Sequence, residues 1–150
     1  MPGVIYKGNG SLEQFTPVNE IFNDNVRHSS LIIRGDQLYV FSTKVGDIPE
    51  RILLATVNMK PPSFFWKASN FIELLKPEKE YEGANLPLQK SSRSAINIPI
   101  NQLRDPYVYQ EGENYYLLYA IAGERGIALA KIKFIDWVIF IIYIGNIIVK

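Results

Sequence analysis

Cysteine is absent from the 150-residue chain, and histidine occurs once, as His28. The lack of cysteine excludes a disulfide scaffold, a thiolate nucleophile and every cysteine-based metal site. One histidine is too few for an HExxH site or a histidine cluster. Glycine-rich nucleotide loops, a GxSxG nucleophile elbow and EF-hand spacing are also missing. We therefore expect no cofactor and no bound metal.

A large excess of either charge is lacking as well. The 16 Lys and Arg residues nearly balance the 15 Asp and Glu residues, which gives a net charge of +1. This balance excludes a strongly basic or acidic tail and leaves no electrostatic footprint for nucleic acid. The first residues, MPGV, show no charged segment followed by a long apolar core, so no signal peptide is expected. We expect a cytoplasmic protein that binds no nucleic acid.

The chain also has no apolar run long enough to cross a membrane as a helix. Residues 134–149 read FIDWVIFIIYIGNIIV, but Asp136 and Asn146 interrupt them, and the uninterrupted part from Trp137 to Ile144 has 8 residues. A spanning helix needs roughly 20 residues. A buried strand is therefore favoured over a membrane element, and no membrane partner is expected. Because nothing else in the chain has this composition, residues 134–150 are interpreted as an atypical apolar tail that does not belong to the preceding fold.

The composition that is present favours β-structure. Apolar residues make up 47% of the chain and charged residues 21%, which is a globular composition. Aromatic residues are 13%, and 10 glycines and 9 prolines supply frequent turn signals. Aromatic and β-branched residues between such signals are typical of strands.

Two segments of the chain resemble each other at an offset of 77 residues. Residues 27–41 lie over residues 104–118, and after a short slip residues 52–57 lie over residues 127–132. In both segments an apolar run, a turn, an aromatic run, a glycine turn and another apolar run follow in the same order. Such a repeat outweighs local propensity as an indication of fold. The strands that it predicts are Ser30–Ile33, Leu38–Thr43, Arg51–Val57 and Phe64–Leu75 in the first unit, and Pro106–Tyr109, Tyr115–Ile121 and Ile127–Ile132 in the second.

Repeated units of four antiparallel strands are typical of β-propeller blades. We therefore predict an all-β fold in which residues 1–133 form about two and a half antiparallel blades of an incomplete propeller, the half blade being the N-terminal segment. Propellers close with four or more blades. The chain would then belong to a larger propeller or associate with copies of itself. The alternative is an antiparallel β domain whose weak repeat is a coincidence.

Three stretches carry a resemblance to a known family: RHSSLIIRGDQLYVFSTKVGDIPERILLATV, YEGANLPL and NQLRDPYVYQEGENYYLLYAIAGERGIALAKI. They resemble the five-bladed β-propeller glycoside hydrolases, a superfamily that includes arabinanases, β-xylosidases, levansucrases, invertases and a family 43-like group. The resemblance covers residues 4 to 132 and corresponds to the C-terminal part of a longer chain. It implies a hydrolase that acts on glycosidic bonds and has carbohydrate as its partner. In that superfamily, carboxylates at the starts of the innermost strands surround an axial funnel.

The resemblance implies a role for two acidic residues. Asp105 lies in an Arg-Asp-Pro motif, which in invertase-like members holds the aspartate that stabilises the transition state. Glu82 opens a long polar connection, residues 81–102, and is the candidate general acid, although in invertases the acid follows the RDP motif. A third carboxylate would lie in an earlier blade. The alternatives are an aspartate that caps the start of a strand and a solvated glutamate in an acidic run.

The repeat register adds a second group of candidates. His28 occupies the position equivalent to Asp105, and Arg27 the position equivalent to Arg104. Both pairs should point towards one axis, where arginine can bind sugar hydroxyls and histidine can exchange a proton. The alternatives are a structural histidine and arginines that pair with neighbouring acids. Glu50 and Glu124 are interpreted as members of surface or interblade ion pairs.

Two classes of function follow. The first is a glycosidase whose site contains Asp105, Glu82, Arg27, His28 and Arg104. The second is a carbohydrate-binding or inactive propeller fragment without catalysis. Within the enzymes, a glycoside phosphorylase would use the arginines and the histidine to hold phosphate.

Overall fold

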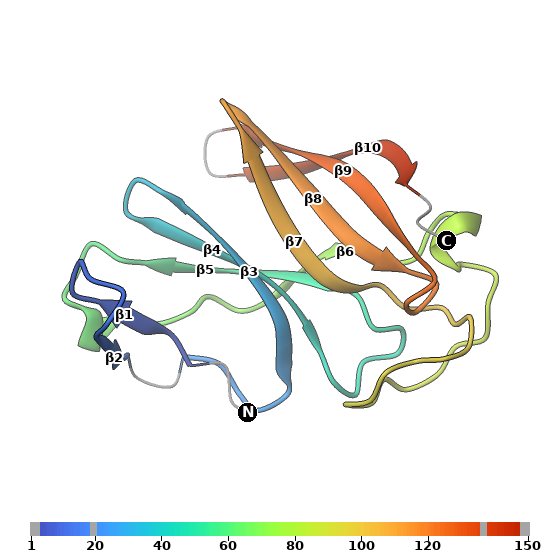
Figure 1. The fold of residues 1–150 in the computed structure, drawn as a ribbon, viewed down its shortest axis with the longest axis horizontal. Coiled ribbons are helices and arrows are strands. Elements are labelled where there is room, and N and C mark those ends of the chain that lie inside the picture. The colour runs from blue at the N-terminus through green and yellow to red at the C-terminus, as the bar shows by residue number, and fades with distance from the viewer. Residues whose placement is uncertain (1–3, 19–20, 136–137, 148–150) are drawn as a thin grey trace.

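The computed structural model describes residues 4–18, 21–135 and 138–147. Its regular structure is almost entirely antiparallel strand, arranged in two four-stranded sheets and one two-stranded sheet (Figure 1). The expected all-β, antiparallel class with four-stranded units is confirmed. Within the described residues no helix is long and apolar enough to cross a membrane.

The first four-stranded sheet is a meander in which each strand pairs with the next. Gly35 makes the turn between its first two strands with a φ of 56°, a conformation that glycine adopts without a steric penalty. The strands are β3 (Val26–Arg34), β4 (Gln37–Lys44), β5 (Ile52–Asn58) and β6 (Ile72–Leu75). The observed last strand, β6, is thus much shorter than the predicted strand Phe64–Leu75.

The second four-stranded sheet repeats this topology. Its strands are β7 (Arg104–Glu111), β8 (Asn114–Ile121), β9 (Gly126–Ile135) and β10 (Val138–Ile147). The apolar tail therefore does not lie apart from the repeat. Phe134 continues β9, and β10 pairs with β9 as the fourth strand. Trp137, within the tail, lies outside the described residues.

Shorter elements connect and flank the two sheets. The N-terminal hairpin of β1 (Tyr6–Gly8) and β2 (Phe15–Pro17) is the two-stranded sheet. Single-turn 3-10 helices occur at Ser63–Phe65 (η1) and Glu80–Glu82 (η2). Residues 83–103, between η2 and β7, contain no strand or helix, as expected for the long polar connection.

The backbone reproduces the repeat at the offset of 77 residues. Gly112 forms the β7–β8 turn with a φ of 57°, matching Gly35. The pairing of β3 with β4 shifts between Arg27 and Ser30, and the pairing of β7 with β8 shifts between the equivalent Arg104 and Tyr107. In β3 and in β7, the inner strands of the two sheets, two residues therefore oppose one residue of the partner strand, which is a β-bulge. The weak sequence repeat is a structural repeat.

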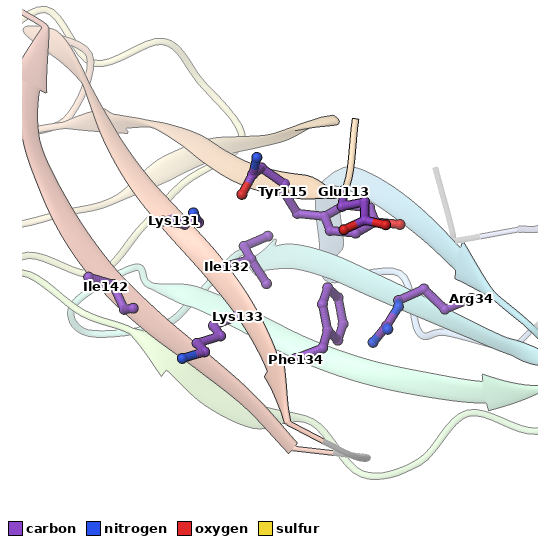
Figure 2. Close-up of a pocket in the computed structure, with 9 residues that line it drawn as sticks. Arg34, Glu113, Tyr115, Lys131, Ile132, Lys133, Phe134 and Ile142 are labelled. Carbon is purple, nitrogen blue, oxygen red and sulfur yellow. The ribbon is translucent and has the colours of Figure 1, made fainter. Parts of the chain in front are cut away.

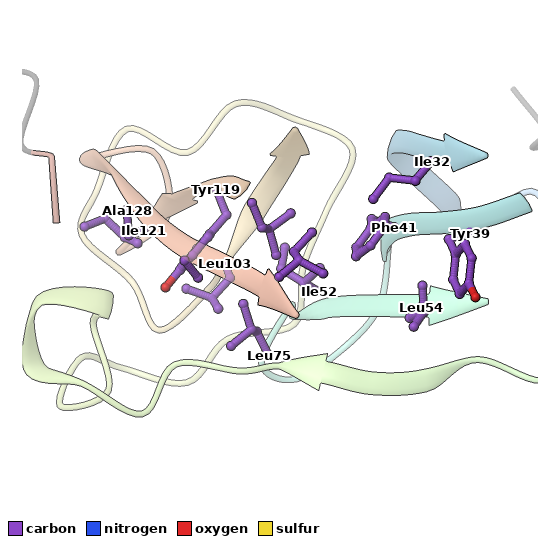
Figure 3. Close-up of a cluster of buried hydrophobic side chains, with 13 residues drawn as sticks. Ile32, Tyr39, Phe41, Ile52, Leu54, Leu75, Leu103, Tyr119, Ile121 and Ala128 are labelled. Carbon is purple, nitrogen blue, oxygen red and sulfur yellow. The ribbon is translucent and has the colours of Figure 1, made fainter. Parts of the chain in front are cut away.

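The main core lies where the two four-stranded sheets meet (Figure 3). Burying apolar side chains from both sheets removes their surface from water, at roughly 1.5–3 kcal/mol for each large side chain. The first sheet contributes Ile32, Tyr39, Phe41, Ile52, Leu54 and Leu75, and the second sheet contributes Leu117, Tyr119, Ile121, Ala128, Ala130 and Ile132. Phe134, Ile139 and Ile141 from the tail pack against the same cluster.

The two sheets stack like successive members of a series, because the interface joins one face of the first sheet to the non-equivalent face of the second sheet. Leu117 and Ala130, which face the first sheet, correspond in register to Val40 and Ala55. Val40 and Ala55 lie on the other side of the first sheet, in a separate core covered by Phe22, Ile5, Ile21 and Trp66. Each four-stranded sheet has two faces. The face of the second sheet that packs on the first sheet is equivalent to the face of the first sheet that packs on the N-terminal segment.

Candidate functional site

The bulges of β3 and β7 bring four of the five predicted site residues together. The two inner strands lie side by side (Figure 1), and the amide of Val108 donates to the Ser30 hydroxyl across them at 2.9 Å. In each bulge the first of the two bulged residues has a positive φ, 52° at His28 and 48° at Asp105. This left-handed conformation is uncommon outside glycine, although aspartate and histidine adopt it more readily than most residues. It turns both side chains out of the regular strand alternation at equivalent positions.

His28 and Asp105 meet at this end of the two strands. Nε2 of His28 lies 3.3 Å from Oδ1 of Asp105, slightly beyond an ideal hydrogen bond. Nδ1 of the same ring lies 3.1 Å from the hydroxyl of Thr43 on β4. The Asp105 side chain is 51% exposed, whereas that of His28 is 25% exposed. The carboxylate is therefore accessible to a ligand, and the ring behind it is mostly enclosed.

Glu50 is the centre of the ion pairs that surround this contact. Its carboxylate is fully buried and accepts two hydrogen bonds from Arg27, at 2.9 and 2.6 Å. Nε of Arg104, from the other sheet, lies 3.1 Å from the same carboxylate. A buried carboxylate needs such partners, because an unpaired charge in the protein interior is very costly. Glu50 thus joins an arginine near the start of β3 to the arginine that begins β7.

Arg104 carries the ion-pair network on to Glu124. Nη1 of Arg104 donates to Glu124 at 2.8 Å and to the carbonyl of Ser94 at 3.1 Å. Nη2 of this almost completely buried side chain has no hydrogen-bond partner among the described residues. A hollow of about 340 Å³ opens beside the network, and it is lined by Asp105, Ala120, Glu124, Arg125, Gly126 and Ile127.

The electrostatic surroundings of His28 favour the neutral ring. Burial lowers its pKa below the usual 6.5, and the nearby Arg27 and Arg104 guanidinium groups lower it further. The Asp105 and Glu50 carboxylates oppose this shift without reversing it. At neutral pH the site therefore presents a neutral imidazole against an accessible carboxylate, which allows proton exchange or hydrogen bonding to a hydroxyl-rich ligand.

Glu82, the fifth predicted site residue, occupies a different environment. It is fully buried at the end of η2. One carboxylate oxygen accepts a hydrogen bond from the Tyr119 hydroxyl at 2.7 Å, and the other accepts from the backbone amides of Glu78 and Lys79, both at 2.9 Å. Burial and the Glu82 carboxylate raise the pKa of the adjacent Tyr81. Glu82 thus anchors η2 to β8, and none of its side-chain hydrogen bonds within the described residues is to Asp105, His28 or Glu50.

A second cavity, of about 330 Å³, lies where β8 begins and β9 ends (Figure 2). The Arg34 guanidinium stacks over the Phe134 ring there, 4.1 Å from its centroid. Arg34 ends β3 and His28 is near its start, so this cavity is at the opposite end of the strand from Asp105. Among the described residues, neither cavity contains three or more histidine, aspartate or glutamate side chains grouped as metal ligands.

The sequence missed two members of the cluster. The sequence predicts Glu50 in a surface or interblade pair; it does join the two sheets, but it is completely buried. For Thr43 the sequence predicts only a strand. The signal for Glu50 was available in principle, because two arginines predicted at one axis need a shared counter-charge. No sequence pattern marks Thr43 as a partner of His28, since that contact depends on strand register and on the bulge.

The comparisons with known proteins indicate a relative but no activity. No family model matches the chain. An uncharacterized protein of Acanthamoeba polyphaga mimivirus is 43% identical over 108 residues, which make up 71% of this chain and 30% of the viral protein. The matched part of the chain thus spans about 30% of the length of that relative. The similarity links the chain to a viral protein that is itself described as uncharacterized.

Proposed function

We propose that the chain is part of a β-propeller that binds carbohydrate and acts on glycosidic bonds, with Asp105 facing the sugar. The observation that carries this proposal is the pairing of His28 with Asp105. These two residues hold equivalent positions in two repeats, share an uncommon backbone conformation and converge at 3.3 Å where the inner strands begin. Strained, accessible polar residues of this kind cluster at functional sites.

The stacking of the sheets supports the propeller part of the proposal. The first sheet packs through a face that contains Ile32, Tyr39, Phe41, Ile52 and Leu54. In register, these residues correspond to Tyr109, Tyr116, Leu118, Ile127 and Leu129 on the outer face of the second sheet, all apolar and all exposed or half-buried. A third sheet could therefore pack on the second sheet in the same way that the second sheet packs on the first.

The length of the viral relative agrees with such a series. Because 108 residues are 30% of it, that protein has about 360 residues, which is room for between four and five units at a 77-residue offset. A propeller of this size would supply carboxylates from further blades to the same axis. The resemblance to five-bladed glycoside hydrolases leads to the same architecture from the sequence motifs.

The chemistry assigned to Asp105 is electrostatic. Glycoside cleavage passes through an oxocarbenium-like transition state, which a nearby carboxylate stabilises. Asp105 is accessible enough to face such a charge, and the His28 ring lies beside it at 3.3 Å. Arg27 and Arg104 act through Glu50 in maintaining this arrangement, since their guanidinium groups are already paired with it.

A non-catalytic carbohydrate-binding role is the second candidate, and the position of Glu82 favours it. Both Glu82 oxygens are occupied in a buried site, so this residue is not placed to protonate a leaving group. A catalytic version needs its acid from another part of a longer protein. A phosphorylase is less favoured, because the arginines that would hold phosphate already pair with Glu50 and Glu124.

The test is binding and hydrolysis of arabino-, xylo- and fructo-oligosaccharides by the 150-residue chain. Binding is followed by NMR shifts of labelled protein, and hydrolysis by release of reducing sugar. Asp105→Asn should lower any hydrolysis rate by about 10²–10³-fold, the usual loss for one electrostatic contribution, and change affinity far less. Asp36→Asn, in the exposed turn after β3, is the matched control. Because the catalytic acid would come from another part of a longer protein, hydrolysis by the 150-residue chain selects the first candidate, and binding alone supports the carbohydrate recognition that both candidates share. The absence of binding to every saccharide class overturns both.

A further inference from the structure

The imidazole of His28 has a partner on each of its nitrogens, and the partners belong to different sheets. Nδ1 faces the hydroxyl of Thr43 on β4 at 3.1 Å, and Nε2 faces Oδ1 of Asp105 on β7 at 3.3 Å. Thr43 is fully buried, so its hydroxyl has a fixed position in the interior. The ring therefore bridges a fixed group and an accessible one.

The chemistry of these partners determines which nitrogen carries the proton. An ionised carboxylate can only accept a hydrogen bond, whereas a threonine hydroxyl can donate or accept. The proton of the neutral ring therefore belongs on Nε2, which faces Asp105, and the Thr43 hydroxyl is then the donor to Nδ1. Glu50 lies 3.9 Å from Nδ1, but its two oxygens already accept from Arg27 and lie beside Arg104.

We propose that His28, with its tautomer set by Asp105 and its other nitrogen hydrogen-bonded to Thr43, is a positioning residue that fixes one oxygen of Asp105 and leaves the other oxygen to face a ligand. The inference rests on the proposed function in one respect, namely that the ligand facing Asp105 is a sugar. The repeat makes the arrangement asymmetric, because the residue equivalent to Thr43 in the second sheet is Ala120. One repeat supplies the orienting ring, and the other supplies the carboxylate that it orients.

The charged groups around the ring are compatible with this role. Arg27 flanks it on β3, Glu50 lies before β5, and Arg104 and Asp105 begin β7. Burial and the two arginines keep the ring neutral at neutral pH. A protonated ring would donate from both nitrogens and could no longer accept from Thr43. The positioning contact is therefore a property of the neutral form.

The first experiment reads the tautomer directly in the full 150-residue chain. His28 is the sole histidine, so a ¹⁵N-labelled sample gives one pair of ring nitrogen signals. At pH 8 we expect protonated Nε2 and unprotonated Nδ1. Asp105→Asn should raise the share of the ring protonated on Nδ1. Thr43→Val should weaken the preference, and Thr43→Ser, which keeps the hydroxyl, should restore it. Backbone amide spectra show whether each variant folds.

A wild-type ring protonated on Nδ1, or a tautomer ratio unchanged in Asp105→Asn, would overturn the positioning role. The second experiment uses an oligosaccharide that the chain is found to bind. His28→Gln retains an N–H donor near the position of Nε2 and should keep affinity within a few-fold, whereas His28→Ala should lose at least about tenfold. Equal affinities in both variants also contradict the role. A correct tautomer without binding to any saccharide refutes the proposed function and leaves the orientation of Asp105 established.

Discussion

At the scale of single residues, this protein shows how one buried carboxylate organises charges from two sheets. Arg27 and Arg104 were candidates for sugar binding because their repeat positions point to one axis. They do converge, but on Glu50. Two arginines brought close together repel each other unless a counter-charge lies between them, and a buried carboxylate is stable only with such partners. The repeat therefore brings the two arginines together, and the buried Glu50 carboxylate between them makes that arrangement stable.

Removing the Glu50 charge should destabilise the fold strongly. Glu50→Gln leaves the mostly buried Arg27 and Arg104 guanidinium groups without their shared counter-charge, and breaking a buried pair costs about 3–5 kcal/mol. Urea unfolding followed by circular dichroism measures the change in unfolding free energy. Glu73→Gln is the control, because Glu73 is 41% exposed and pairs with Arg51 and Lys76 near the surface. Its loss should cost about 0–1 kcal/mol. Equal effects would show that Glu50 is not the centre of the network.

The lowered pKa of His28 makes stability depend on pH in a defined direction. The unfolded ring binds a proton near pH 6.5, whereas the folded ring binds it only at lower pH. The stabilisation from the neutral ring is therefore complete above about pH 6.5 and is lost as the pH falls through the folded pKa. Unfolding free energies at pH 8 and pH 5 should differ more in the wild type than in His28→Asn. A variant with the same pH dependence as the wild type would contradict the burial of a neutral ring.

At the scale of elements, the C-terminal apolar segment shows that composition and strand pairing can point in different directions. Its composition differs from the rest of the chain, and for this reason residues 134–150 were separated from the repeat. The structure shows that Phe134 extends β9 and that β10 completes the sheet. Phe134 also stacks edge-on against Tyr39 and Tyr115, at 5.2 and 5.3 Å between ring centroids. An apolar strand needs no family-like pattern to add to a sheet edge, since the edge offers unpaired backbone groups to any extended segment.

Loss of this segment should therefore lower stability. Phe134→Ala removes a half-buried ring that contacts both sheets, and we expect a loss of about 2–3 kcal/mol, below the 3–5 kcal/mol of a fully buried phenylalanine. Phe140→Ala is the matched control, because this ring is 47% exposed on β10. Thermal unfolding compares the two variants with a chain that ends at Lys133. If truncation at Lys133 leaves the melting temperature unchanged, β10 contributes nothing to the fold.

At the scale of the whole molecule, the stack of two sheets is open on one side. The N-terminal segment covers the far face of the first sheet, but the outer face of the second sheet exposes apolar side chains such as Tyr109 and Ile127. Contiguous apolar surface of this kind promotes association. The equivalent face of the first sheet is buried against the second sheet. The repeat therefore explains why the second sheet carries an apolar face suited to association.

The isolated chain should therefore self-associate at tens of micromolar. Leu118→Asp puts a charge in the centre of the exposed face and should shift sedimentation velocity profiles towards the monomer. Leu12→Asp, at a 91% exposed position in the N-terminal hairpin, should leave the profiles unchanged. A wild-type chain that is monomeric and unfolds cooperatively would count against an open stack of blades.

The sequence by itself determined the strand class, the antiparallel repeated units and their 77-residue register, although it placed the fourth strand of the second unit outside the repeat. These depend on local alternation and on turn residues such as Gly35 and Gly112, which act over a few neighbouring positions. The sequence also indicated that His28 and Asp105 would share one place, because equivalent residues in stacked repeats meet. Only the tertiary structure decided that Glu82 is a buried anchor, that Glu50 joins the two arginines and that Thr43 faces His28. Each of these contacts joins residues far apart in the chain or across a bulge, and burial and register exist only once the sheets have packed.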